Sequence, residues 1–142
     1  MDTNSFKRYL AGMVDADGHM SWRGSPNFSP ILGVTNVNLD LHRLLVEKLG
    51  GSYSTQRRIC ADGLRCREKH IHRRQNTTKW HISGQRVIIV LRNILPFMIV
   101  KADKAKRMMQ MYRDHFSKMQ RPERRNFHIH KEEVFMKVRG WE

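Results

Sequence analysis

Two aspartates, Asp15 and Asp17, lie near the end of a nine-residue stretch, L-A-G-M-V-D-A-D-G, at positions 10–18. The residues before them have helical apolar spacing, so both carboxylates fall at the negative end of a helix macrodipole, where each costs about 0.3–1 kcal/mol. Two carboxylates placed there indicate a nearby cation, and a hard divalent ion prefers oxygen ligands. The spacing alone leaves open the alternative that both residues merely build a turn before Gly18.

A second group of possible ligands has the spacing C-x5-C-x3-H-x-H. This is not the spacing of a standard zinc finger, and Asp62-Gly63 within it is better explained by a hairpin turn. We therefore expect no zinc at Cys60, Cys66, His70 and His72. The nine methionines, five of them between 98 and 119, are expected to fill the core rather than bind metal.

The pair of aspartates needs a helix before it and a strand after it. Residues 5–14 are predicted to be helical because apolar residues recur at i, i+3, i+4 and i+7. Residues 19–23 alternate, with Met20 and Trp22 on one side, as in a half-buried strand. The later elements are predicted, in order, as a strand ending near 34–35, a helix capped by Asn38 and ended by Gly50, strands near 52–59 and 76–82, a helix capped by Ser83 and stopped by Pro96, a helix after Lys101, and a short helix near 130–139.

This order, αββαββα with C-terminal helical segments, predicts an α+β fold. At 142 residues the chain is long enough for one domain and too short for two ordinary ones. We expect a single domain over 1–142, with a core of about 5–119 and a C-terminal extension over 120–142.

Charge indicates the partner. The chain has 27 Lys and Arg against 13 Asp and Glu, a net charge of +14 and a pI of about 10.6. Small soluble domains seldom carry more than about eight net charges for solubility alone, so the excess favours a polyanion. A membrane is not expected, because no apolar run approaches the ~20 residues that span a bilayer. The N-terminus lacks a secretory signal and the cysteines are few, so we expect an intracellular, reducing compartment that contains DNA.

The stretch at 10–18 resembles the signature of the LAGLIDADG homing endonucleases, from which it differs only at Met13 and Val14. The likeness extends over roughly 5–110, because V-T-N at 34–36 and L-P-F-M-I-V-K at 95–101 resemble further family segments. The resemblance implies an αββαββα fold whose four antiparallel strands form a saddle over double-stranded DNA. It also implies a Mg²⁺-dependent enzyme in which Mn²⁺ can substitute.

The resemblance assigns roles by position. Asp17 matches the metal-binding acid, and the backbone carbonyl of Ala16 matches a second metal contact. Lys101 matches the basic residue near the scissile phosphate, with Lys104 next in line, and Asn36 matches a group that orders water around the metals. Asp15 matches a mainly structural acid. Some relatives carry an arginine a turn after the Asn36 position; this chain has Asp40 and Arg43 there, so the holder of that role stays open.

The predicted strands also give candidate DNA contacts. Alternation with the core residues points polar side chains toward the groove, and a basic stretch near 65–74 is expected to meet phosphates. The candidates are His19, Ser21, Arg23, Asn27, Ser29, Thr55, Arg57, Arg65, Arg67, Arg73, Arg74, Lys79 and His81.

The signature occurs once, and family members with one motif work as homodimers. We therefore expect two copies to meet through Ala11, Gly12 and Asp15, and to cut a long pseudo-palindromic target with short 3′ overhangs. Two other functions on the same fold stay open. They are an RNA-splicing maturase and a DNA-binding regulator that does not cleave.

Overall fold

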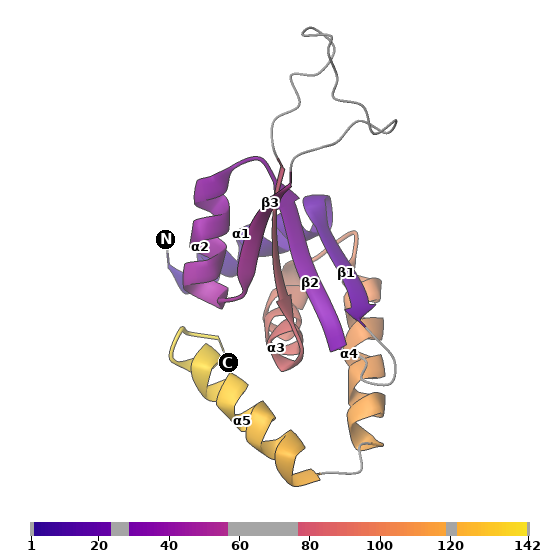
Figure 1. Ribbon diagram of the computed structural model, residues 1–142. Helices are drawn as coiled ribbons and strands as arrows, with labels where there is room; N and C mark the ends of the chain where they lie inside the picture. The colour runs from indigo at the N-terminus through magenta and orange to yellow at the C-terminus, as the bar shows by residue number, and fades with distance from the viewer. Residues whose placement is uncertain (1, 24–28, 57–76, 119–121, 142) are drawn as a thin grey trace, which may run out of the picture.

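Four strands form one antiparallel sheet in the order β1-β2-β4-β3, with helices against one side (Figure 1). The computed structural model describes residues 2–23, 29–56, 77–118 and 122–141. The elements are α1 (Thr3–Asp17), β1 (Gly18–Arg23), β2 (Ser29–Asn36), α2 (Leu39–Leu49), β3 (Ser52–Gln56), β4 (Thr77–Ser83), α3 (Gln85–Ile94), the 3-10 turn η1 (Leu95–Phe97), α4 (Ala102–Ser117) and α5 (Pro122–Lys137). The predicted α+β class and αββαββα order are confirmed.

The sheet has two chemically different faces because side chains alternate along each strand. Leu32 and Val34 of β2 are fully buried, as are their cross-strand partners Ile82 and Trp80 of β4. Helices α1 and α3 pack against this side and lie behind the sheet in Figure 1. Residues of the opposite parity lie on the open face. No helix of the described residues is long and apolar enough to cross a bilayer.

Helix α1 extends further than predicted at both ends. Asp2 caps it, since its carboxylate accepts from the Ser5 amide at 2.9 Å, and the helix continues through Asp17. Gly18 begins β1 directly. A Cβ at Gly18 would lie 2.6 Å from the Val14 carbonyl oxygen, so only glycine allows the chain to turn this closely from helix to strand.

The predicted cap of α3 is wrong. Ser83 is the last residue of β4, and Gly84 occupies the cap position with a φ of 72°, without a side-chain cap. The Gly84 amide instead donates to the Pro30 carbonyl at 2.9 Å, which extends the pairing of β2 with β4 by one residue. The C-terminal helix is also longer than predicted, since it begins at Pro122.

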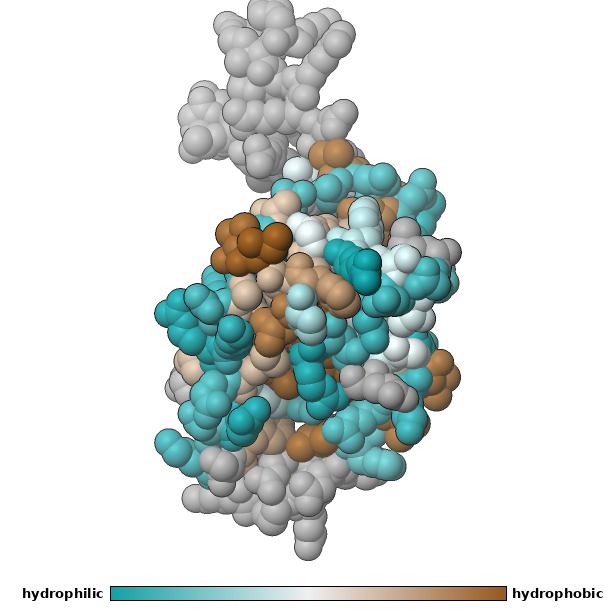
Figure 2. Space-filling view, turned by 180° about the vertical axis from the view of Figure 1, so that it is seen from behind, coloured by the Kyte–Doolittle hydropathy of each residue, from teal (hydrophilic) through white to brown (hydrophobic). Residues whose placement is uncertain are grey.

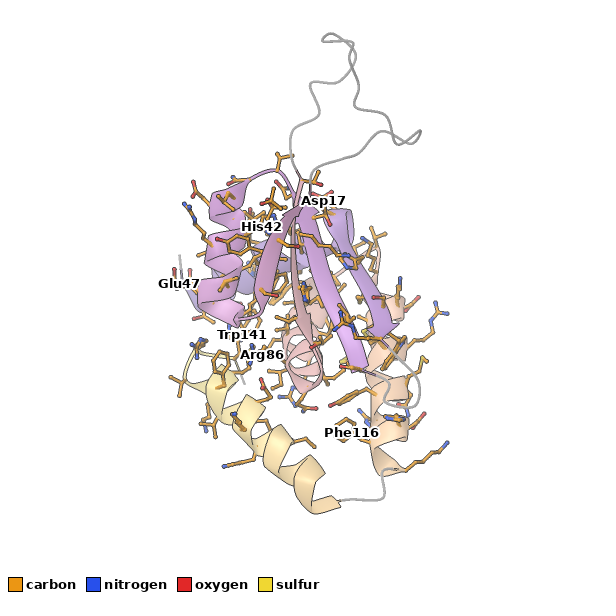
Figure 3. The ribbon with its side chains drawn as sticks, in the orientation of Figure 1. Asp17, His42, Glu47, Arg86, Phe116 and Trp141 are labelled. Atoms are coloured by element: carbon orange, nitrogen blue, oxygen red, sulfur yellow. The ribbon has the colours of Figure 1, made fainter. Side chains whose placement is uncertain are left out.

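The C-terminal segment packs into the same core as α1. Trp141 is 1% exposed, and its ring meets Phe6 of α1 edge-on at 6.0 Å between centroids. Met136 of α5 is fully buried beside it, and Arg86 of α3 forms a half-buried ion pair with Glu132 at 2.8 Å. Figure 3 shows Trp141 and Arg86 together, at the end of the sheet far from Asp17. The last residues thus brace α1 and α3.

Trp141→Ala should lower the free energy of unfolding by about 3–5 kcal/mol, because it removes a large buried ring and leaves Phe6 facing a cavity. Urea unfolding measures this loss. Val138→Ala is the control, since Val138 is 80% exposed and should change stability by less than about 0.5 kcal/mol. A loss below about 1 kcal/mol for Trp141→Ala would contradict the bracing role.

Candidate active site and nucleic-acid face

The Asp15 carboxylate holds the segment before α4. It accepts from the amide of Ile99 at 2.6 Å, of Lys101 at 2.9 Å and of Val100 at 3.2 Å. Partial burial alone would raise the pKa of Asp15, but these three bonds outweigh it and hold the pKa below its ordinary value. The structural role that the resemblance implied for Asp15 fits this geometry. All three bonds lie within one copy of the chain, and the predicted place of Asp15 in a dimer interface stays a prediction.

The Lys101 ammonium, which lies in the segment that Asp15 holds, donates in turn to backbone carbonyls at the end of α1. Its Nζ donates to the carbonyl oxygens of Gly18 at 2.7 Å, Val14 at 2.9 Å and Ala16 at 3.4 Å. The last carbonyls of a helix lack backbone partners and carry partial negative charge, so an ammonium there is favourable. The structure thus brings Lys101 to Ala16, the carbonyl that was predicted to reach metal.

Asp17 differs from Asp15, its neighbour two residues away. It is exposed and forms no hydrogen bond or ion pair with any described residue. Figure 3 shows it at the end of the sheet where α1 passes into β1. A carboxylate at a helix C-terminus with no protein partner is available to a cation.

The predicted catalytic residue Asn36 is partly committed to the fold. Its side-chain oxygen accepts from the Asn38 amide at 2.9 Å, and its carbonyl oxygen lies 3.2 Å from Nε2 of the fully buried His42. Asn38 then caps α2, as predicted. The role of Asn36 in ordering water stays a prediction. Arg43 pairs with Asp40 at 3.1 Å on the exposed side of α2.

The open face of the sheet is lined by small and polar side chains. Its members follow from the register with the buried positions: His19, Ser21, Arg23, Ser29, Ile31, Gly33, Thr35, Ser52, Ser54, Thr77, Lys79, His81 and Ser83. Six predicted contacts therefore share one face, namely His19, Ser21, Arg23, Ser29, Lys79 and His81. Their contact with DNA stays a prediction.

Thr55 is a correction, because it lies on the helix-covered side of the sheet. It pairs with Thr78, which is buried, and their hydroxyl oxygens are 3.2 Å apart. Ser52 and Ser54 occupy the open face instead. The missed signal was Tyr53, whose ring stacks on His42 on the helix side, since residues two apart in a strand share a face.

The His19 ring covers Gly33, the central residue of the open face. A Cβ at Gly33 would collide with the His19 imidazole and lie 2.9 Å from the Trp80 carbonyl. Burial lowers the pKa of His19, and Lys79, His81, Lys104 and Lys101 lower it further. The open face near Asp17 therefore gathers several cationic groups, which is the electrostatic character of a phosphate-binding surface.

Several predicted residues lie outside the described part of the chain. They are Asn27, Arg57, Arg65, Arg67, Arg73 and Arg74 among the DNA contacts, and Cys60, Cys66, His70 and His72 of the zinc pattern.

The predicted dimer residues do not share one environment. Ala11 is fully buried within the chain, so its assignment to a dimer interface is wrong. Gly12 is exposed, and a Cβ there would meet nothing within 4 Å. Figure 2 shows a compact hydrophobic patch among hydrophilic residues on the helical side. Ile99 and Val100, which Asp15 holds beside α1, are 87% and 76% exposed.

The oxygen ligands at the end of α1 fit a hard divalent cation, but the described residues of one copy do not complete its coordination shell. The Asp17 carboxylate and the Ala16 carbonyl are both oxygen ligands, as Mg²⁺ requires. Within the described ranges, no three Asp, Glu, His or Cys side chains gather into a metal site. Bound phosphate, water or a second copy could supply further oxygen ligands.

The fold is similar to that of solved homing endonucleases. I-CvuI with the I-CreI target and Mg²⁺, its DNA not cleaved, aligns over 78% of this chain and 68% of its own, at 20% identity and a TM-score of 0.52. I-CvuI with its target Sro1.3 and Ca²⁺ aligns over 96% and 81%, at 19% identity and 0.52. The archaeal intron-encoded I-Vdi141I with DNA aligns over 80% and 67%, at 21% identity and 0.49. No protein-family model and no curated protein matches the sequence.

The chain has the homing-endonuclease fold. The four-stranded antiparallel sheet that the resemblance implied is thereby confirmed.

Asp15→Asn should destabilise the fold by about 1–3 kcal/mol, because one amide oxygen cannot replace a carboxylate that accepts three bonds. Because the folded-state pKa is lowered, the stabilisation is present above the ordinary aspartate pKa and is lost as the pH falls below roughly 4. Urea unfolding of both proteins at pH 6 and pH 3 should therefore show a gap that narrows in acid. Asp17→Asn is the control and should not destabilise, since Asp17 bonds to no described residue. An equal loss from both variants would contradict this account of Asp15.

Proposed function

We propose that this chain is a LAGLIDADG homing endonuclease, a site-specific enzyme that cuts both strands of double-stranded DNA as a homodimer with a divalent cation. The observation that carries the proposal is the exposed Asp17 carboxylate at the helix end whose carbonyls accept from the Lys101 ammonium, at one end of an open polar sheet face. The two I-CvuI structures of similar fold hold DNA targets, one in the presence of Mg²⁺ and one in the presence of Ca²⁺. The net charge of +14 supports a polyanionic substrate.

The reaction is hydrolysis of a phosphodiester. Water attacks the phosphorus, the bond to the 3′ oxygen breaks, and the products are a 3′-hydroxyl and a 5′-phosphate. Mg²⁺, or Mn²⁺ in its place, supplies Lewis-acid stabilisation of the developing charge when it is bound. Asp17 and the Ala16 carbonyl would hold the ion.

Lys101 acts through its charge. Its ammonium is fixed by the carbonyls of α1, so it stabilises the negative charge that builds on the phosphate without moving. Asn36 keeps an amide NH₂ that can order water, since only its oxygen is committed to Asn38.

Two copies are needed because each supplies one Asp17 and a duplex has two strands to cut. The exposed stripe of α1 contains Tyr9, Gly12 and Ala16, and the open space over Gly12 lets a second helix approach closely. Ile99 and Val100 flank this stripe and add apolar area to the interface. Twofold symmetry then implies a pseudo-palindromic target, cut with short 3′ overhangs.

Asp17→Asn should reduce cleavage roughly 10²–10³-fold or more, because the variant loses a ligand of the cation that would stabilise the transition state. DNA binding should be kept, because the variant also loses a charge that repels phosphate. The measurement is plasmid linearisation with Mg²⁺ on a target selected from a randomised library. Glu47→Gln, the same charge change on α2 and away from Asp17 in Figure 3, is the control. Near-wild-type cleavage by Asp17→Asn would sink the proposed mechanism.

Binding measurements beside this cleavage assay separate the other functions on this fold. Specific binding without cleavage by the wild type would favour a DNA-binding regulator. Tighter binding to a structured RNA than to any duplex would favour a splicing maturase.

Gly12→Leu should weaken the dimer by roughly tenfold or more, because overpacking an interface costs about 1–3 kcal/mol. Its helical circular dichroism should be unchanged, since a side chain at this position meets nothing within one copy. Sedimentation with and without DNA measures the dimer, and Glu47→Leu, which places a leucine on another exposed helix surface, is the control. A wild-type protein that is monomeric in both conditions would contradict the dimer.

A further inference from the structure

One hydrophobic side chain interrupts the open face. Ile31 of β2 is the only large apolar residue on this face among the described strand positions. It is half-buried, whereas Leu32 beside it points the other way into the core.

The residues directly opposite Ile31 and two positions away on its own strand are small, while the longer side chains of His19, Arg23 and His81 occupy the diagonal positions of the same face. Its cross-strand neighbours are Ser21 on β1 and Ser83 on β4, and both serines are exposed. Along its own strand, the residues two positions away are Ser29 and Gly33. None of these four has a side chain long enough to cover the isoleucine methyl groups. The result is an apolar spot with hydroxyl groups on two sides.

This chemistry matches one base. In the major groove, thymine alone presents a methyl group at C5 beside the acceptor oxygen O4, whereas cytosine has an amino donor there and no methyl. An apolar floor suits the methyl group, and a serine hydroxyl beside it can donate to O4. Purines present neither an equivalent methyl nor the same spacing.

We propose that Ile31, with Ser21 or Ser83, is a thymine-reading subsite, which rests on the proposed function as a DNA endonuclease. Ile31 stands three residues from Val34, the partner of Gly18 directly after Asp17. That separation is roughly 10 Å along the strand. The thymine therefore lies several base pairs from the scissile bond, once in each half-site.

The test uses two pools of randomised duplex DNA, one made with thymidine and one with deoxyuridine, which lacks only the methyl group. Wild-type protein selected on the thymidine pool should enrich thymine at one position of each half-site. Replacing that thymine by deoxyuridine should weaken binding roughly three- to fivefold per half-site, the effect expected from one buried methyl group. Binding is measured by fluorescence anisotropy at fixed salt.

Variants connect the effect to the subsite. Ile31→Ser should remove the methyl dependence, while Ile31→Val, which keeps a β-branched apolar side chain, should retain it. Ser21→Ala and Ser83→Ala should show which hydroxyl binds O4, since only one should lower the preference for thymine or deoxyuridine over cytosine.

The outcomes separate this inference from the proposed function. Enriched sequences that bind equally well with deoxyuridine overturn the subsite and leave the endonuclease standing, and this comparison needs only wild-type protein. A methyl dependence that survives in Ile31→Ser also overturns it. Methyl-dependent binding without cleavage supports the subsite and removes the catalytic proposal, and the absence of any enriched sequence overturns both.

Discussion

The site depends on reciprocal hydrogen bonds between the end of α1 and the residues before α4, in which each segment supplies one charged side chain. Asp15 accepts from three backbone amides of the second segment, and Lys101 donates to carbonyls of the first. Hydrogen bonds to charged groups contribute about 1.5–3 kcal/mol each, roughly twice a neutral bond. Two segments separated by 84 residues in sequence are thereby held in one geometry, and each supplies what the other lacks.

These reciprocal hydrogen bonds leave one charged group, the Asp17 carboxylate, without a partner among the described residues. Two carboxylates at the end of a helix are unfavourable, but Asp15 is satisfied by amides and the carbonyls of the last turn are satisfied by Lys101. Asp17 then remains as the single carboxylate of this helix end without a partner among the described residues. The unpaired negative charge therefore lies where a cation is proposed to bind. A bound cation would offset the unfavourable interaction of the Asp17 carboxylate with the helix dipole.

The sequence was informative where the interactions are local. Period and capping predicted α1, β1 and α2 because their apolar residues and Asn38 act within a few positions. It failed where parity or distance decides. Thr55 was assigned to the wrong face although it shares a side of β3 with Tyr53, because one large apolar residue among Ser and Thr gives only a weak alternation. Ala11 cannot be told from Gly12 by composition. The packing of Trp141 on Phe6 joins residues near opposite ends of the sequence, and no local sequence pattern predicts it.

In the proposed enzyme, the sheet would tie base recognition to the position of the cut. Asp17 passes directly into β1, so every residue on the open face stands at a spacing from it that the strand geometry fixes. The buried Trp80 anchors the middle of the sheet, because its indole donates to the Gly50 carbonyl at 2.9 Å. Gly33 adds to this by leaving room for the His19 ring to lie over the middle of the open face. A base contact at Ile31 and the carboxylate at Asp17 therefore belong to one rigid surface, and a shift of the DNA by one base pair would misplace both at once.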